Sequence, residues 1–186
     1  LHLETRSRHY DIGGETASTA DRIEIASGEA TGSARGARYE RARETLLLES
    51  EVRLRIGAGG EIFRASSQRA TVDLGRDRIE FLGGAAVESE RSGAMTGEKV
   101  VLGLGPGRRV AALAAEGKAA ARLADARGTR ELEGGRIEFG IAGGKRLERV
   151  RVAGAAELRS VSSTGRERLR GEEIDLDFDP AGAPRE

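Results

Sequence analysis

The chain has 186 residues, enough for one domain with a sizeable core or for one elongated repeat array. Its 31 basic and 31 acidic side chains cancel, which argues against a protein that binds nucleic acid or an anionic membrane through net charge. Aromatic residues make up only 3% and cysteine is absent, which leaves little material for base-stacking or aromatic sugar clefts and excludes disulfides and thiolate metal sites.

The first half of the chain predicts short strands followed by one long strand. Apolar and polar residues alternate from Leu1 to Thr5 and from Asp21 to Ile25, with a turn signal at Gly13-Gly14. From Ala30 to Tyr39 the residues are small and polar and give no clear pattern. Thr45 to Ile56 alternates most regularly, and a strand of this length spans roughly 40 Å at about 3.3 Å per residue.

The second half predicts hairpins. The clearest has a strand from Arg136 to Ile141, a turn at Gly143-Gly144 and a returning strand from Leu147 to Leu158, because each strand has one apolar face and glycine supplies the positive φ of a short turn. The alanine-rich stretch Val110 to Ala126 has helical propensity, but its mid-run glycine and the surrounding hairpin rhythm favour a strand. A last strand is expected from Leu169 to Phe178.

The hairpins recur with a regular period. Turn signals fall about every 17 residues, near positions 42, 58, 76, 92, 106, 128, 143, 163 and 181, so two strands make a repeat of about 35 residues. A short motif of glycine and small residues also repeats, at Gly83 to Val87, Glu116 to Ala120 and Ala153 to Glu157. We expect this motif to end each returning strand. We therefore predict about eleven long antiparallel strands, stacked hairpin on hairpin around a continuous apolar interior.

The repeats resemble the OstA-like family of lipopolysaccharide-transport proteins, which comprises LptA, LptC and the amino-terminal domain of LptD. Leu169 to Phe178 is similar to the family phrase L-x-G-x-x-I-x-L-x-x, and Glu148 to Ala156 to the phrase R-V-x-A-x-G-x-V. Ala37 to Glu40, leading to the strand at Leu46 to Leu54, looks like an LptC-type repeat. The resemblance covers roughly residues 20–183.

The resemblance implies an all-β fold, an antiparallel jellyroll of two sheets that form a taco-like open groove, in a single domain over residues 1–186. It also implies a non-enzymatic carrier in the periplasm that holds lipopolysaccharide or a related glycolipid by its acyl chains and needs no cofactor. Other jellyroll domains would dock at the edge strands, and head-to-tail self-association would use the same edges. The residues expected to line the groove are Leu46, Leu48, Val52, Leu54, Ile56, Val72, Leu74, Ile79, Phe81, Val87, Val100, Leu102, Ile137, Phe139, Ile141, Val150, Val152, Leu158, Ile174, Leu176 and Phe178.

Other interpretations of these features stay open. The same apolar residues would also pack sheet on sheet as a sealed core, and a structural β-solenoid or filament scaffold is the alternative function. Spacing of about 17 residues between glycine-rich reversals favours antiparallel hairpins over parallel solenoid coils. Alanine and glycine at interior positions such as Ala85, Ala115, Gly117 and Ala119 depart from the large aliphatic residues expected there and would leave room for lipid.

Few residues suggest chemistry. Asp175, Asp177 and Asp179 form an acidic row that faintly resembles a calcium site, but a solvated outer face explains them better. His2 and His9 have no partner motif for metal or catalysis, and no serine lies in a nucleophile elbow. The glycine-rich run 103–107 joins strand to strand and opens no helix, as a phosphate cradle would require. We expect no enzyme. The chain lacks an apolar run of membrane-spanning length and a visible signal peptide, and its ends suggest a segment of a longer protein.

Overall fold

A computed structural model describes residues 2–4, 9–11, 16–89, 93–125, 128–143, 146–163 and 165–179, and of 2–4 and 9–11 only the backbone. Nearly all of these residues lie in antiparallel strands. The helical elements of this part of the chain are two short 3-10 turns, η1 (Arg41–Arg43) and η2 (Pro106–Arg108). Within the same ranges, no helix has the length and apolar character to cross a bilayer.

In the described part of the chain, thirteen strands form one sheet. Their order is β1-β3-β4-β5-β6-β8-β9-β10-β11-β12-β13, while β2 pairs with β3, and β7 pairs with β5 and β8. All pairings are antiparallel, which confirms the predicted fold class of stacked long hairpins. The strands are β1 (His2–Glu4), β2 (His9–Asp11), β3 (Thr16–Ser27), β4 (Ala30–Glu40), β5 (Thr45–Ala58), β6 (Glu61–Ser67), β7 (Arg69–Asp73), β8 (Arg78–Ser89), β9 (Gly93–Gly105), β10 (Arg109–Asp125), β11 (Gly128–Ala142), β12 (Arg146–Ser162) and β13 (Gly165–Asp177).

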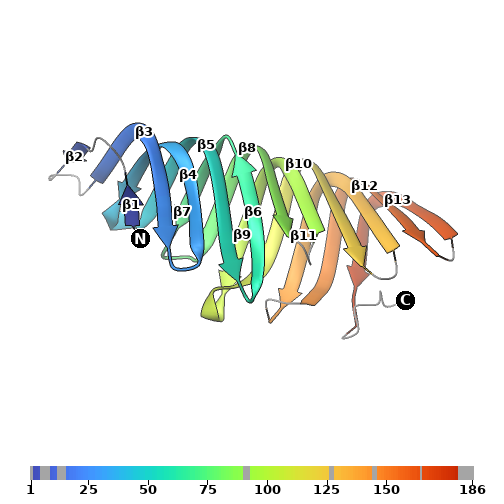
Figure 1. The fold of residues 1–186 in the computed structure, drawn as a ribbon. Helices are drawn as coiled ribbons and strands as arrows, with labels where there is room; N and C mark the ends of the chain where they lie inside the picture. The colour runs from blue at the N-terminus through green and yellow to red at the C-terminus, as the bar shows by residue number, and fades with distance from the viewer. Residues whose placement is uncertain are drawn as a thin grey trace.

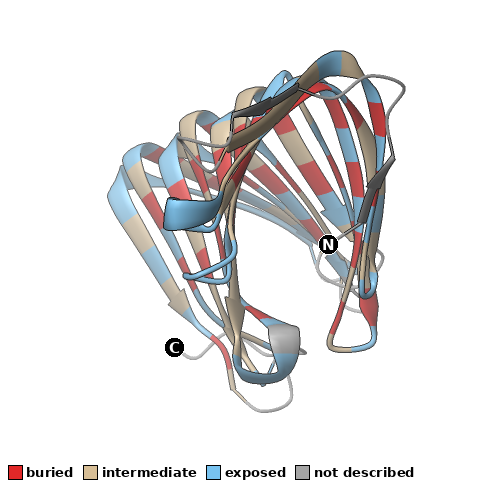
Figure 2. Cartoon of the chain, turned by 90° about the vertical axis from the view of Figure 1, so that its left-hand side faces the viewer, coloured by how far each residue is buried: buried red, intermediate tan, exposed pale blue. Residues whose placement is uncertain are grey.

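The sheet is folded over along its length, so its two halves face one another as two arms. Each long strand arches over the top of the molecule, runs down one side and returns by a turn at the bottom (Figure 1). Viewed from one end, the arms join above and their free ends lie below (Figure 2). The two predicted layers are therefore arms of one continuous sheet. We call the arm that contains β7 the first arm and the arm that contains β6 the second arm.

Irregular backbone marks the fold line between the arms. The register of β10 with β11 jumps between Glu116 and Ala119, and that of β12 with β13 jumps between Ala153 and Ala156. A β-bulge bends and twists the strand that carries it, so bulges aligned across neighbouring strands fold the whole sheet. Several of these positions have positive φ, among them Gly83, Gly84, Gly117, Lys118, Gly154 and Ala155.

The position of the glycine phrases corrects the sequence analysis. Gly83 to Val87, Glu116 to Ala120 and Ala153 to Glu157 lie in the middle of β8, β10 and β12, not at the ends of strands as expected. Glycine suits both places for the same reason, because it adopts the positive φ that a turn or a bulge requires. Local sequence alone does not distinguish a turn from a mid-strand bulge.

The remaining strand predictions hold. β5 covers the regular alternation at Thr45 to Ile56, and the alanine-rich stretch forms β10 rather than a helix. The stretch Ala30 to Tyr39, which gave no clear pattern, forms β4 because it pairs on both sides with β3 and β5. The turn signals near 42, 58, 76, 106, 143 and 163 fall between strands. The signals at Gly13-Gly14 and near 92 and 181 lie outside the described residues.

Candidate functional site

The interior between the arms is the main apolar surface of the protein. One face of each strand from β3 to β12 contributes to a single cluster of buried residues that includes Phe63, Phe81 and Phe139, each at most 2% exposed. Buried and exposed positions alternate along the strands (Figure 2), and most charged residues stand at the exposed or half-buried positions. The interior runs the length of the sheet, because neighbouring strands keep the same face inward.

The structure brings the predicted lining residues together, with one exception. The members that belong to the buried cluster are Leu46, Leu48, Val52, Leu54, Ile56, Ile79, Phe81, Val87, Val100, Leu102, Ile137, Phe139, Val150, Val152, Leu158 and Phe178. Val72, Ile141, Ile174 and Leu176 are partly buried and pack against it. Their shared face is established, whereas a role in binding lipid stays a proposal.

Leu74 is the exception, since it is not part of the buried cluster. It is 36% exposed and follows the end of β7, in the turn to β8, where its backbone N–H donates to the carbonyl of Glu44 at 2.9 Å. β7 ends at Asp73, so the prediction that Leu74 lines the groove beside Val72 was wrong. A strand pattern holds only as long as the strand stays paired.

Small interior residues are covered by protein atoms. Ala85, Ala115, Ala119 and Ala121 were expected to leave room between the arms, yet all are between 0 and 5% exposed. Side chains of the two arms therefore already pack against one another around these alanines.

The interior face also carries polar residues, which the sequence pattern did not lead us to predict. Glu61 is only 7% exposed, although it is charged, and its carboxylate accepts a hydrogen bond from the hydroxyl of Ser89. Glu61 stands two residues before the buried Phe63, and Ser89 two residues after the buried Val87. That spacing was the available signal, because residues two apart on a strand share a face whatever their polarity.

A charged network on the outer face joins β12 to the edge strand β13. Glu157 is contacted by Arg159, Arg168 and Arg170, with nitrogen–oxygen distances of 2.5, 2.7 and 2.9 Å. Partial burial by itself raises the pKa of the Glu157 carboxyl, but hydrogen bonds from Arg159 and Arg170 outweigh it, and the pKa falls below its ordinary value of 4.5.

Asp175 and Asp177 of the predicted acidic row belong to a second group of ion pairs between β12 and β13. A hydrogen bond from Arg149 is the main reason that the pKa of Asp175 lies below its ordinary value of 3.8, against the opposing effect of desolvation. Asp177 also contacts Arg149, at 3.8 Å. These carboxylates are exposed side chains paired with arginine, and the described residues hold no cluster of metal-ligating side chains. The side chains of His2 and His9 lie outside the described part.

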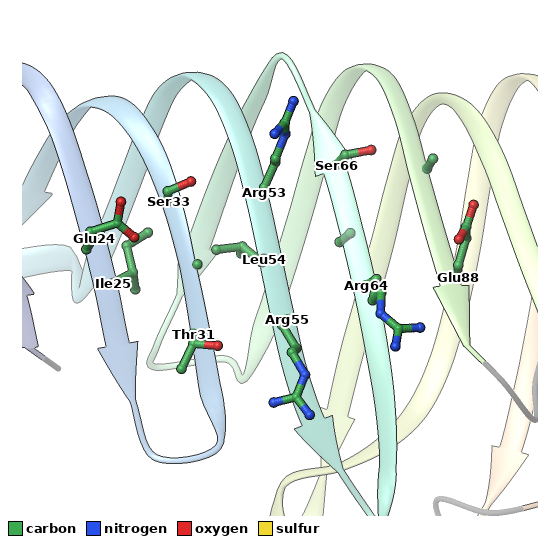
Figure 3. A pocket seen from close by; sticks show the side chains of 13 residues that line it. Glu24, Ile25, Thr31, Ser33, Arg53, Leu54, Arg55, Arg64, Ser66 and Glu88 are labelled. Atoms are coloured by element: carbon green, nitrogen blue, oxygen red, sulfur yellow. The ribbon is translucent and has the colours of Figure 1, made fainter.

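The outer face of the second arm carries a shallow depression of about 590 Å³. Figure 3 shows Arg53 and Arg55 projecting from β5 and Arg64 from β6, with Ser33, Ser66 and Thr31 around them. Arg55 and Arg64 are direct cross-strand neighbours, a like-charged pair that weakens strand pairing slightly. Ile25, Leu54 and Ala65 of the buried cluster also line this depression.

The two ends of the sheet differ. β13 pairs with β12 on one side and ends the strand order on the other, as predicted for Leu169 to Phe178. Its inward-facing Leu169 is 52% exposed, while Ile174 and Leu176 are partly buried. At the opposite end β1 and β2 pair with different parts of β3, so these two three-residue strands form that edge. A free, partly apolar strand edge is suited to strand addition.

Comparison with known proteins identifies a similar fold. No family model matches the chain, and no curated protein matches it. A solved structure of LptH from Pseudomonas aeruginosa, described as the LptA-homologous periplasmic component of the conserved lipopolysaccharide transport device, superposes with a TM-score of 0.50. The alignment is 19% identical and covers 62% of this chain and 75% of LptH. At this identity the likeness shows that the two proteins share a fold.

Proposed function

We propose that this chain is a non-enzymatic lipid-carrier module of the periplasm, which holds the acyl chains of lipopolysaccharide or a related glycolipid between its two arms. The observation that carries the proposal is the continuous apolar face along the whole sheet. Its fold is that of LptH, whose description as a periplasmic transport component supports the same compartment and ligand here. Residues 1–186 would act as one module.

Hydrophobic burial supplies the binding energy in this proposal. Each methylene that leaves water contributes about 0.8 kcal/mol, so part of one acyl chain is enough for specific retention without polar contacts. Because the interior side chains already pack against each other, acyl chains enter as the arms separate and take the place of contacts between them. The aligned bulges at the fold line are the natural hinge for that motion.

Photo-crosslinking tests the lipid-binding role. Val72 and Ile141, which are partly buried on the interior face, would each be replaced by p-benzoylphenylalanine, and the folded protein would be irradiated with purified lipopolysaccharide. We expect adducts at both positions and none at the outer-face positions Arg53 and Glu80. Folding of each variant would be checked by circular dichroism. Folded interior variants that form no adduct would instead support a sealed core and a scaffold function.

We also propose that further jellyroll domains, including a second copy of this chain, add to the sheet at β13. The inward-facing Leu169 and Ile174 of this edge would then be covered by the next interior. Lysine at these two positions is expected to weaken self-association at least tenfold in analytical ultracentrifugation, since a charge on the inward face of an edge blocks pairing. Glu172→Lys, at the β13 bulge, is the matched charge control, and equal weakening by it would contradict interior-to-interior docking.

A further inference from the structure

The free ends of the two arms differ in polarity on their inner faces. On the first arm the last inward-facing residues are apolar and only partly buried, and they pack against the core. These residues come from β4, β7, β9, β11 and β12, so the end of the first arm is apolar along much of the sheet. We call this set the apolar lip: Tyr39, Val72, Leu104, Ile141 and Leu147.

On the second arm several of the corresponding positions are polar, although Ala30 and Ala58 at strand ends of this arm are apolar. Glu61 and Ser89 continue the inward faces of Phe63 and Val87, as described above. Arg130 stands two residues before the buried Leu132, and Ser160 two residues after the buried Leu158, so both face inward. We call this set the polar lip: Glu61, Ser89, Arg130, Ser160 and Glu167.

Strand register places three of these residues side by side. Arg130 of β11 pairs with Ser160 of β12, and Ser160 pairs with Glu167 of β13. Leu169, two residues after Glu167, pairs with the inward-facing Leu158, which fixes the face that Glu167 shares. A cation, a hydroxyl and a carboxylate therefore form one row across neighbouring strands, about 5 Å apart from strand to strand.

Stability does not account for a polar lip. A buried carboxylate such as Glu61 is costly unless it is hydrogen-bonded, and an apolar residue would continue the core at this position. The first arm shows that this fold accepts apolar residues at the ends of its strands. Polar side chains that face inward on one arm only are explained if a polar group regularly lies against them.

We propose that the bound amphiphile lies between the arms in one orientation, with its hydrocarbon against the apolar lip and its headgroup against the polar lip. The inference rests on the proposed lipid-carrier function. It adds that the headgroup is bound by the second arm. Guanidinium and hydroxyl groups donate to phosphate or carboxylate, while carboxylates accept from hydroxyl or ammonium groups. The row of Arg130, Ser160 and Glu167 thus fits a headgroup that offers both donors and acceptors, as a phosphorylated sugar does.

A pair of ligands separates headgroup recognition from hydrophobic binding. The double variant Ser160→Ala/Glu167→Ala would be titrated with purified lipopolysaccharide and with N-phenyl-1-naphthylamine, an apolar fluorophore without a comparable headgroup. We expect the Kd for lipopolysaccharide to rise about tenfold, as for the loss of two charge-assisted hydrogen bonds. The Kd for the fluorophore should stay within about twofold. Leu147→Ser in the apolar lip should weaken both ligands, because it removes hydrophobic contact.

The control is the double variant Glu131→Ala/Arg166→Ala, which changes the outward-facing neighbours of the same row. It should leave both affinities unchanged. Unchanged lipopolysaccharide affinity in Ser160→Ala/Glu167→Ala, with both ligands still bound by the unmodified protein, would overturn the orientation alone. If the unmodified protein bound neither ligand, this result would contradict both the carrier function and the proposed orientation.

Discussion

Single residues at the fold line adopt backbone conformations that their side chains disfavour. Glu51, Lys118 and Ala155 have φ values of 52, 50 and 55°. In this left-handed region the Cβ atom crowds the following carbonyl, which costs roughly 1–2 kcal/mol for a residue other than glycine. Neighbouring strands hold these residues in place, because each bulge is flanked by regular pairs on both sides.

Ala155→Gly should therefore stabilise the protein. We expect the free energy of unfolding to rise by about 0.5–1 kcal/mol, the relief at positive φ less the greater backbone entropy that glycine loses on folding. Urea denaturation measures this change in the free energy of unfolding. Ala153→Gly, two residues away but outside the positive-φ bulge, is the control and should lose about 0.5–1 kcal/mol. Equal destabilisation by both would mean that Ala155 is not strained.

At the scale of the element, β13 depends on charge pairing more than on burial. It is exposed along most of its length, and its outer face is joined to β12 through Glu157 and Asp175. Both carboxyls have pKa values below their ordinary ones. A carboxyl whose pKa is lower in the folded than in the unfolded protein adds stability above the unfolded pKa, and that contribution disappears as pH falls through the folded pKa.

The attachment of β13 should thus weaken in acid. We expect hydrogen exchange at β13 amides to be faster at pH 3 than at pH 6, after correction for intrinsic rates, while exchange in β5 changes less. Glu157→Gln should loosen β13 at pH 6, and its difference from the unmodified protein should shrink as the pH falls through the folded pKa of Glu157, because protonation has the same effect as the substitution. A difference that does not shrink as the pH falls would show that the carboxylate acts through packing rather than charge.

For the whole molecule, the topology is a stack of nearest neighbours. Apart from the β1–β3 pairing and the β5–β8 region, each described strand pairs with the strands next to it in the chain. Stability in such a stack is roughly a sum of local units and the interfaces between them. The molecule should accordingly tolerate loss of an end more readily than loss of an internal strand.

A chain ending at residue 142, without β12 and β13, should still fold. We expect a β-type circular dichroism spectrum and a cooperative urea transition with a smaller m value, because less surface is exposed on unfolding. Deletion of residues 128–142 removes β11 alone. In their present directions β10 and β12 would then be parallel neighbours, and the connection between them would be too short for a parallel pair. We therefore expect the chain beyond β10 not to fold. Unfolding of the chain ending at 142 would contradict the nearest-neighbour description.

The sequence by itself determined the strands, most turns and the residues that share the apolar face. Alternation in β5, β11 and β12 is local, and a strand with one apolar face hides that face in any fold it joins. Which glycine-rich phrase is a turn and which is a bulge was decided only by tertiary structure, since it depends on where a neighbouring strand continues to pair. The near-complete burial of Glu61, the strand neighbours of Arg130 and Glu167, and the exposure of Leu74 followed from the same long-range pairing. A residue's neighbours along the chain set its face on the strand, but only its neighbours across the sheet decide what that face meets.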